Sequence, residues 1–121
     1  MKYLLLIYDN EQVWSKMSEA QGREMYQEYG AFTADIQKSG HMKNGAQLQP
    51  IATATSIRVR DGKRVVTDGP FAETREQLGG FYLIEAKDLD EAIQIGARIP
   101  SAKTGTIEVR PLVEAAVPTS A

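Results

Sequence analysis

Two segments of the chain are apolar at almost every position, and they predict the central strands of a β-sheet. Both the odd and the even positions of Lys2–Asp9 (KYLLLIYD) are mostly apolar, and Phe81–Ala86 (FYLIEA) repeats this pattern with Glu85 as its exception. Successive side chains of a strand point to opposite faces, so each predicted strand has two apolar faces. We therefore expect the two strands to pair and both faces of their sheet to be covered.

Two other segments repeat their apolar residues with the period of an α-helix. The first runs from Ser18 to about Ser39, opens with the capping-box pair Ser18 and Gln21, and ends before Gly40. Its apolar positions recur at intervals of four, three and four residues and are Met25, Tyr29, Phe32 and Ile36. We expect this stripe to face the sheet.

The second helical segment starts at Asp88 and is stopped by Pro100. Asp88 and Glu91 repeat the capping-box spacing, and the apolar residues that follow can face the sheet. Thr106–Leu112 is typical of a last strand. These elements predict a single domain over residues 1–113, and the Ala-, Pro-, Ser- and Thr-rich residues 114–121 are expected to be disordered.

A β-hairpin is predicted between the two helices. A strand over Met42–Gln49 ends at Pro50, and Ala52–Arg60 then leads into Lys63–Thr67 through Asp61-Gly62, a preferred dipeptide for tight turns. The full order of elements predicts an α+β ferredoxin-like sandwich with an inserted β-hairpin. Two helices cover one face of such a sheet. A second copy of the sheet is the simplest cover for the other face, which predicts a homodimer.

The connection from Asp68 to Phe81 (DGPFAETREQLGGF) has the most unusual composition in the chain. It opens with a turn signal, because glycine permits positive φ and proline fixes its own φ. Thr74 and Gln77 have capping-box spacing, which predicts one helical turn closed by the following glycine pair. We expect a folded loop between two strands.

Composition narrows the chemistry that the chain can perform. Among its 121 residues are no cysteine and one histidine, and its net charge is −2. Thiol chemistry is therefore excluded, a typical zinc site lacks nitrogen ligands, and only carboxylate sites for magnesium or calcium stay open. The charge predicts neither a nucleic acid nor a membrane as partner. Without a signal sequence or long apolar run, the protein is expected to be cytoplasmic.

The segment DGPFAETREQLGGFYLIEA, together with KYLLLIYD and the later DLDEAIQIGARIP, resembles the YCII-related proteins of the DGPF type. The resemblance covers residues 1 to about 112. It implies a ferredoxin-like fold that pairs into a dimeric α+β barrel with a cleft. It also implies a signalling context, because DGPF-type relatives are often associated with extracytoplasmic-function sigma factors.

Some YCII-related proteins are thought to pair a histidine on the first helix with an aspartate. For this chain the resemblance thus implies a cofactor-free, lyase-like or dehydrohalogenase-like acid–base activity. The first predicted helix, however, holds no histidine. The single histidine, His41, follows the Gly40 cap, where the negative end of the helix explains it without catalysis.

Polar residues near the predicted cleft are the candidates for chemistry. Asp68 is the leading catalytic candidate as an acid–base group, and the alternative is that its carboxylate accepts backbone N–H groups and holds the turn. The candidates for ligand binding are Tyr8, Asp9, Glu28, Glu73 and Arg75. No metal site or cofactor is predicted from them.

Two classes of function follow from these features. The first is a protein that binds a small organic molecule in the dimer cleft, either as a binder or as an acid–base enzyme. The alternative is a non-enzymatic regulatory or interaction protein in sigma-factor signalling.

Overall fold

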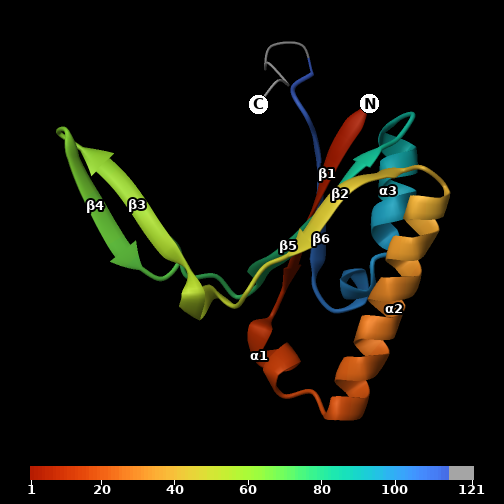
Figure 1. The fold of residues 1–121 in the computed structure, drawn as a ribbon, viewed down its shortest axis with the longest axis horizontal. Coiled ribbons are helices and arrows are strands. Elements are labelled where there is room, and N and C mark those ends of the chain that lie inside the picture. Colours follow the sequence, from red (N-terminus) through yellow and green to blue (C-terminus); the bar gives the residue numbers. More distant parts are fainter. Residues whose placement is uncertain (115–121) are drawn as a thin grey trace.

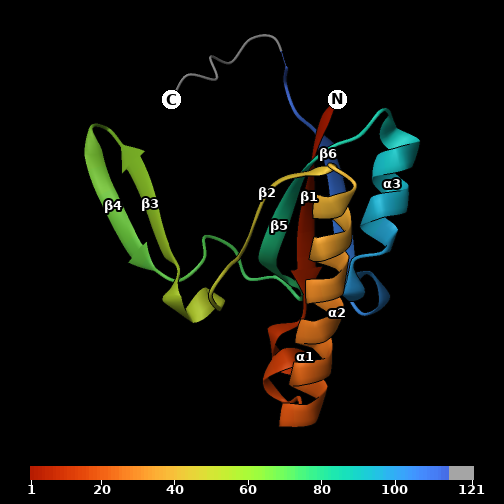
Figure 2. The ribbon, with the colours of Figure 1, turned by 45° about the vertical axis from the view of Figure 1, so that its right-hand side comes forward.

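The computed structural model describes residues 1–114 and contains one antiparallel sheet of four strands in the order β2-β5-β1-β6. These strands are β1 Lys2–Asp9, β2 Met42–Gln47, β5 Gln77–Glu85 and β6 Thr106–Pro111. Helices α2, Glu19–Lys38, and α3, Leu89–Ala97, cover one face of this sheet (Figures 1 and 2). The predicted α+β ferredoxin-like arrangement is confirmed.

The two central strands pair as the sequence predicts. β1 and β5 are antiparallel, with Leu5 opposite Tyr82 and Leu4 opposite Leu83. Leu5 and Tyr82 are buried beneath the helices, together with the other core residues of the sheet. Leu4 and Leu83 point the other way. We call the half-buried side chains on that side the outer face; they are Leu4, Leu6, Tyr8, Phe81 and Leu83.

Helix α2 begins and ends where its caps predict. The Ser18 side chain accepts from the Gln21 N–H, and the Gln21 side chain accepts from the Ser18 N–H, so the capping box is complete. Toward its carboxyl end, α2 buries Phe32 and Ile36, and the Phe32 ring lies edge-on to Tyr82 with centroids 5.2 Å apart. The first half of α2 has no buried residue.

The predicted hairpin forms a separate unit that projects from the body of the molecule (Figures 1 and 2). Strands β3, Thr55–Arg60, and β4, Lys63–Asp68, pair with each other in a sheet of two strands. Their turn has positive φ at both central residues, 52° at Asp61 and 74° at Gly62, as a tight hairpin requires. We call residues 55–68 the arm.

Three shorter helical elements complete the chain. Helix α1, Glu11–Ser15, follows β1 and carries Trp14. A 3-10 turn, η1 Ile51–Thr53, leads into the arm, and a second, η2 Pro100–Lys103, leads into β6. No helix within residues 1–114 is long and apolar enough to cross a membrane.

One local prediction is wrong. Thr74 and Gln77 do not start a helical turn: Thr74 Oγ1 donates to the Glu76 carbonyl, and Gln77 is the first residue of β5. Gln77 pairs with Asp9, so the strand begins four residues earlier than predicted. Pairing in the sheet gives hydrogen-bond partners to backbone N–H and C=O groups that a single helical turn would leave unpaired. Of the predicted tail, residues 115–121 lie outside the described part.

Gly105 is required by the close packing of the chain before β6. A Cβ at this position would overlap the backbone oxygen of Tyr8 and lie 3.0 Å from Cα of Asp9. We expect Gly105→Ala to lower the free energy of unfolding by about 3 kcal/mol, because the backbone must shift. Urea denaturation measures this. Gly22→Ala in α2, where nothing lies within 4 Å, should instead stabilise the protein by about 0.5 to 1 kcal/mol; similar losses in both variants would contradict this account.

Candidate functional site

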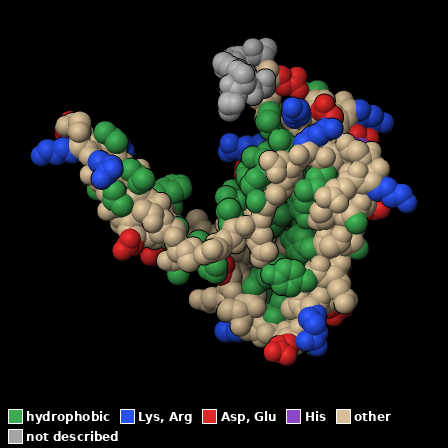
Figure 3. Space-filling model, in the orientation of Figure 1, with side chains coloured by type: hydrophobic (Ala, Val, Ile, Leu, Met, Phe, Trp, Pro, Cys, Tyr) green, Lys and Arg blue, Asp and Glu red, His purple; other side chains and the backbone are tan. Residues whose placement is uncertain are grey.

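A cavity of about 680 Å³ lies between helix α2 from Met25 to Gln37, helix α1 and the edge of the sheet at β2 and β5. Figure 3 shows the hollow in the body of the molecule, lined largely by hydrophobic side chains. The aromatic residues that line it include Trp14, Tyr26, Tyr29 and Tyr82. The volume lies within the range of about 300 to 1,000 Å³ that is typical of small-molecule sites.

Helix α2 forms one wall of the cavity with residues that recur about once per turn. Tyr26, Gly30, Ala34 and Gln37 all line it. At Gly30 nothing lies within 4 Å of the place where a Cβ would stand, so this glycine leaves space open. Glycine in a helix interior costs about 0.5 to 1 kcal/mol relative to alanine, and here that cost accompanies a wider cavity.

Two pairs of hydroxyl groups stand in the cavity wall. The Tyr29 hydroxyl lies 2.5 Å from Ser101 Oγ, and the Tyr82 hydroxyl lies 2.7 Å from Thr33 Oγ1. Burial raises the pKa of Tyr29 and of Tyr82 above the ordinary value for tyrosine, although their hydroxyl partners oppose the shift. Both phenols are therefore neutral at pH 7 and can donate or accept hydrogen bonds.

The carboxylate of Asp9 is the buried polar group at the end of β1, where only 8% of the residue is exposed. Its Oδ1 accepts from the Asn10 N–H at 2.9 Å. Its Oδ2 accepts from Trp14 Nε1 at 2.9 Å and from Thr104 Oγ1 at 2.8 Å. This carboxylate thus holds the Trp14 indole against the cavity and ties α1 to the segment before β6.

Glu11 connects α1 to the chain segments before and after the arm. Its Oε2 accepts from the Ile51 N–H at 3.0 Å, and its own N–H donates to Gln77 Oε1 at 2.9 Å. Asp9 and Glu11 are the two charged residues among those that line the cavity, and no Lys, Arg or His of the described chain joins them. The lining thus includes two carboxylates and no cationic side chain of the described residues.

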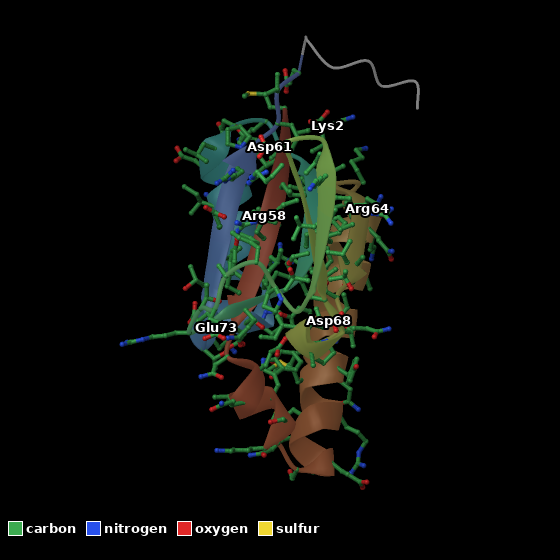
Figure 4. All side chains as sticks on the ribbon, turned by 90° about the vertical axis from the view of Figure 1, so that its left-hand side faces the viewer. Lys2, Arg58, Asp61, Arg64, Asp68 and Glu73 are labelled. Carbon is green, nitrogen blue, oxygen red and sulfur yellow. The ribbon has the colours of Figure 1, made fainter. Side chains whose placement is uncertain are left out.

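Of the six residues predicted from the sequence, the structure brings Asp9 into the cavity wall. Tyr8 lies on the outer face, where its hydroxyl donates to Glu108 Oε1 at 3.3 Å. Glu28 lies on the exposed side of α2 beside a smaller hollow of about 300 Å³. Asp68, Glu73 and Arg75 are exposed at the base of the arm and in the loop that follows it (Figure 4).

The turn at Asp68 is held by groups other than its carboxylate. The Gly69 N–H donates to the Ala54 carbonyl at 2.7 Å, and Ser56 Oγ donates to the Gly69 carbonyl at 2.8 Å. Gly69 has φ of 98°, which explains the glycine of the DGPF segment. Within residues 1–114 the Asp68 side chain makes no hydrogen bond. Its catalytic assignment stays a prediction.

Sequence reasoning missed most of the cavity wall. Tyr29 was interpreted as part of the buried stripe of the helix, and Ser101 and Tyr82 carried no signal of a site. Gly30, an isolated glycine inside a strong helical pattern, was the one available sign that α2 borders an open space.

His41 lies apart from the cavity. Its Nδ1 is 2.6 Å from Ser39 Oγ, and its Nε2 is 3.3 Å from Glu91 Oε1. The ring thus connects the end of α2 to α3. In the described part of the chain, no cluster of three or more His, Cys, Asp or Glu side chains is arranged to hold a metal ion.

The family model of the YCII-related domain matches residues 1–116. The chain belongs to the YCII-related family. Over 114 residues this YCII-related protein is 39% identical to an uncharacterised protein of Rhizobium meliloti (strain 1021). The aligned region covers 93% of this chain and 92% of the relative.

Among solved structures, this YCII-related protein is similar to a 5-chloro-2-hydroxyhydroquinone dehydrochlorinase from Burkholderia phenoliruptrix AC1100 in complex with 2,5-dihydroxybenzoquinone. The two chains are 13% identical, with a TM-score of 0.49, and the match covers 95% of this chain and 96% of the other. A likeness at this level assigns no chemistry to this chain.

Asp9→Asn tests the anchoring role of the buried carboxylate. The asparagine side chain replaces one carboxylate oxygen by an NH₂ group, which then faces at least one of the three donors Asn10, Trp14 and Thr104. We therefore expect the free energy of unfolding to fall by about 1 to 3 kcal/mol. Trp14 is the only tryptophan, so the loss of its anchor should also shift the fluorescence emission to longer wavelength. Urea denaturation and emission spectra measure the two effects.

Asp35→Asn is the control for this variant. Asp35 forms an exposed ion pair with Arg98, so its loss should cost less than about 1 kcal/mol and leave the emission unchanged. If Asp9→Asn behaves like Asp35→Asn in both measurements, the carboxylate does not anchor the indole.

Proposed function

We propose that this YCII-related protein binds a small, uncharged and largely apolar organic molecule in the cavity beneath α2. The observation that carries the proposal is a cavity of about 680 Å³ with an aromatic lining and neutral hydroxyl groups in its wall. The sequence predicted a cleft between two copies as the ligand site, whereas this cavity is formed within one chain.

The charge of the lining supports an uncharged ligand. Asp9 and Glu11 contribute carboxylates, and among the described residues no cationic side chain lines the cavity to balance an anion. A carboxylate or phosphate ligand would lose its hydration and meet like charge, and both effects weaken binding. The aromatic side chains favour a flat, apolar ring.

The neutral hydroxyl groups support a ligand with a hydroxyl or carbonyl substituent. Tyr29 and Tyr82 already pair with Ser101 and Thr33; one hydroxyl of each pair donates to the other, so each pair keeps one O–H to donate to a carbonyl and lone pairs to accept from a hydroxyl. A few such polar groups in an apolar site orient a ligand and exclude molecules that leave them unsatisfied.

A cofactor-free acid–base activity is the second candidate function. It is favoured by the Asp9 carboxylate in the cavity wall, close to the end of β1. Three hydrogen bonds hold this carboxylate, which favours binding and positioning over proton transfer. Asp68, the predicted acid–base residue, would need a second chain or a ligand near the arm to take part in chemistry.

We also propose that the protein is a homodimer. The outer face of the sheet carries Leu4, Leu6, Phe81 and Leu83, which the helices of the same chain do not cover. Burial of each such side chain is worth about 1.5 to 3 kcal/mol, so a second copy on this face is strongly favoured.

Gly30→Leu tests the proposed ligand site, with 4-methylphenol as the probe. Leucine at position 30 fills space in the cavity, so we expect the affinity for 4-methylphenol to fall at least tenfold. The indole N–H resonance of Trp14, unique in this chain, reports binding in a titration by NMR. The wild-type protein should bind 4-methylbenzoate, with the same ring and a carboxylate, at least tenfold more weakly than 4-methylphenol.

Gly22→Leu is the matched control, because Gly22 lies on the same helix, borders open space and does not line the cavity. Both leucine variants should raise the melting temperature, since leucine has a higher helix propensity than glycine. Equal affinities in the two variants would place the ligand elsewhere, and equal binding of the phenol and the benzoate would reject the charge argument.

The homodimer is tested by light scattering after gel filtration at micromolar concentration. We expect a mass about twice that of one chain, because the outer face needs a cover. A mass of one chain across the accessible concentration range would remove this part of the proposal and leave the cavity unaffected.

A further inference from the structure

The arm has two faces of different character. Directly paired residues of two antiparallel strands point to the same side of a sheet. Three pairs share the side that we call the apolar face, namely Thr55 with Asp68, Ile57 with Val66, and Val59 with Arg64. Figure 3 shows hydrophobic side chains gathered on the visible side of the arm. The opposite side, which we call the basic face, carries Arg58, Arg60 and Lys63.

The apolar face is not covered by its own chain. Ile57, Val59 and Val66 are 63%, 61% and 53% exposed. The arm stands away from the body in both ribbon views, and its two strands pair with each other (Figures 1 and 2). A hairpin of two strands is at best marginally stable in water, and packing of its apolar face on another surface stabilises it. The face therefore favours a cover from another molecule.

The apolar face is complementary to itself. The pair Ile57–Val66 forms its middle row. On β4, Arg64 lies two residues before Val66 and Asp68 lies two residues after it. Because a strand rises about 3.4 Å per residue, both charges lie about 7 Å from the middle row, and their signs are opposite. A second copy of the face that runs in the reverse direction therefore places each charge against its opposite.

Neither charge is paired within the part of the chain that the structure describes. The ion pairs of residues 1–114 involve other side chains. Arg64 and Asp68 are both exposed, and Figure 4 shows them apart along β4, with Asp68 at the base of the arm. Both groups are thus available to a second molecule.

We propose that the arms of two copies stack through their apolar faces, in opposite directions about a twofold axis. The axis passes through the middle row, so Ile57 and Val66 meet their own counterparts. At each end of the contact, Arg64 faces Asp68 of the partner subunit. The contact does not use the outer face of the sheet, which stays available for the homodimer proposed above. It gives Asp68 a role in recognition between chains.

The basic faces favour stacking through the apolar side. Stacking through the basic faces would bring six basic groups together, three from each copy. In the proposed contact these groups point away from it, on the two outer surfaces of a double layer. Facing sheets lie about 10 Å apart, and salt screens exposed charges beyond about 8 Å at physiological ionic strength. Repulsion between the two basic faces is therefore weak.

The contact is small. Six side chains from each copy are fewer than the roughly 20 to 30 residues that each side of a stable interface supplies. The arms of free chains are therefore expected to associate weakly, and the tests use millimolar protein.

Ile57 and Val59 are a matched pair for a crosslinking test, because they lie on the same face at similar exposure and the chain has no cysteine. In the stacked arms the two copies of Ile57 face each other, whereas the two copies of Val59 lie about 13 Å apart along the strands. With a short bis-maleimide, we expect Ile57→Cys to join two chains at least tenfold faster than Val59→Cys. Each rate is divided by the rate of the same thiol with a monofunctional maleimide. Equal ratios would overturn the proposal.

A mixture of two variants tests the direction of stacking. Val59 faces Thr55 of the partner subunit when the arms run in opposite directions. Val59→Cys mixed with Thr55→Cys should therefore give the mixed crosslink, identified by its mass, at least tenfold faster than Val59→Cys joins to itself. A mixed crosslink no faster than that would overturn the antiparallel arrangement.

Charge reversal tests the ion pairs across the axis. In the Ile57→Cys protein, Arg64→Asp places two acidic groups against each other at each end, and crosslinking should slow at least threefold. Asp68→Arg should slow it by repulsion between basic groups. The double change Arg64→Asp/Asp68→Arg makes the charges opposite again and should restore the rate.

Lys63→Asp is the control for net charge, because Lys63 precedes Arg64 and lies on the basic face. Its rate should stay within a factor of two of that of the Ile57→Cys protein. A double variant as slow as the single ones, or equal slowing by Lys63→Asp, would overturn the charge pairing. The mass from light scattering at micromolar concentration tests the homodimer separately, so either proposal can fail alone.

Discussion

The buried carboxylate of Asp9 is the interaction on which the architecture around the cavity depends. It accepts hydrogen bonds from Asn10, Trp14 and Thr104, which belong to segments up to 95 residues apart in sequence. A buried carboxylate is stable only when hydrogen bonds satisfy its oxygens, so burial of Asp9 depends on all three donors being in place. The set holds α1 beneath the end of the sheet and brings Gly105 against the backbone of Tyr8 and Asp9.

The cavity follows from how two sides of α2 are used. One side packs on the sheet through Phe32 and Ile36, which are buried in the core. An adjacent side, with Tyr26, Gly30 and Ala34, borders the space next to β2 and β5, which helix α1 and Trp14 also line. Gly30 widens this space at a cost in helix stability.

The structure also separates the DGPF segment from the cavity. Asp68, Gly69 and Phe71 stand at the base of the arm, where the glycine makes the turn and the phenylalanine is exposed. The first residues of the segment that carries the resemblance thus belong with the arm, whereas its later residues, Gln77 and Tyr82 of β5, line the cavity. Glu11 joins the two regions, because it bonds to Ile51 before the arm and to Gln77 after it.

Elements with local signals could be predicted from the amino-acid sequence. The capping box at Ser18, the Asp61-Gly62 turn and the two strands with apolar faces all formed as predicted, since each depends on neighbouring residues alone. In contrast, three features depend on how the folded chain packs: Gln77 joins a strand, Tyr29 borders a cavity, and the hairpin projects from the body. Periodicity shows which residues share a face, but what covers that face depends on segments distant in sequence, which no local pattern encodes.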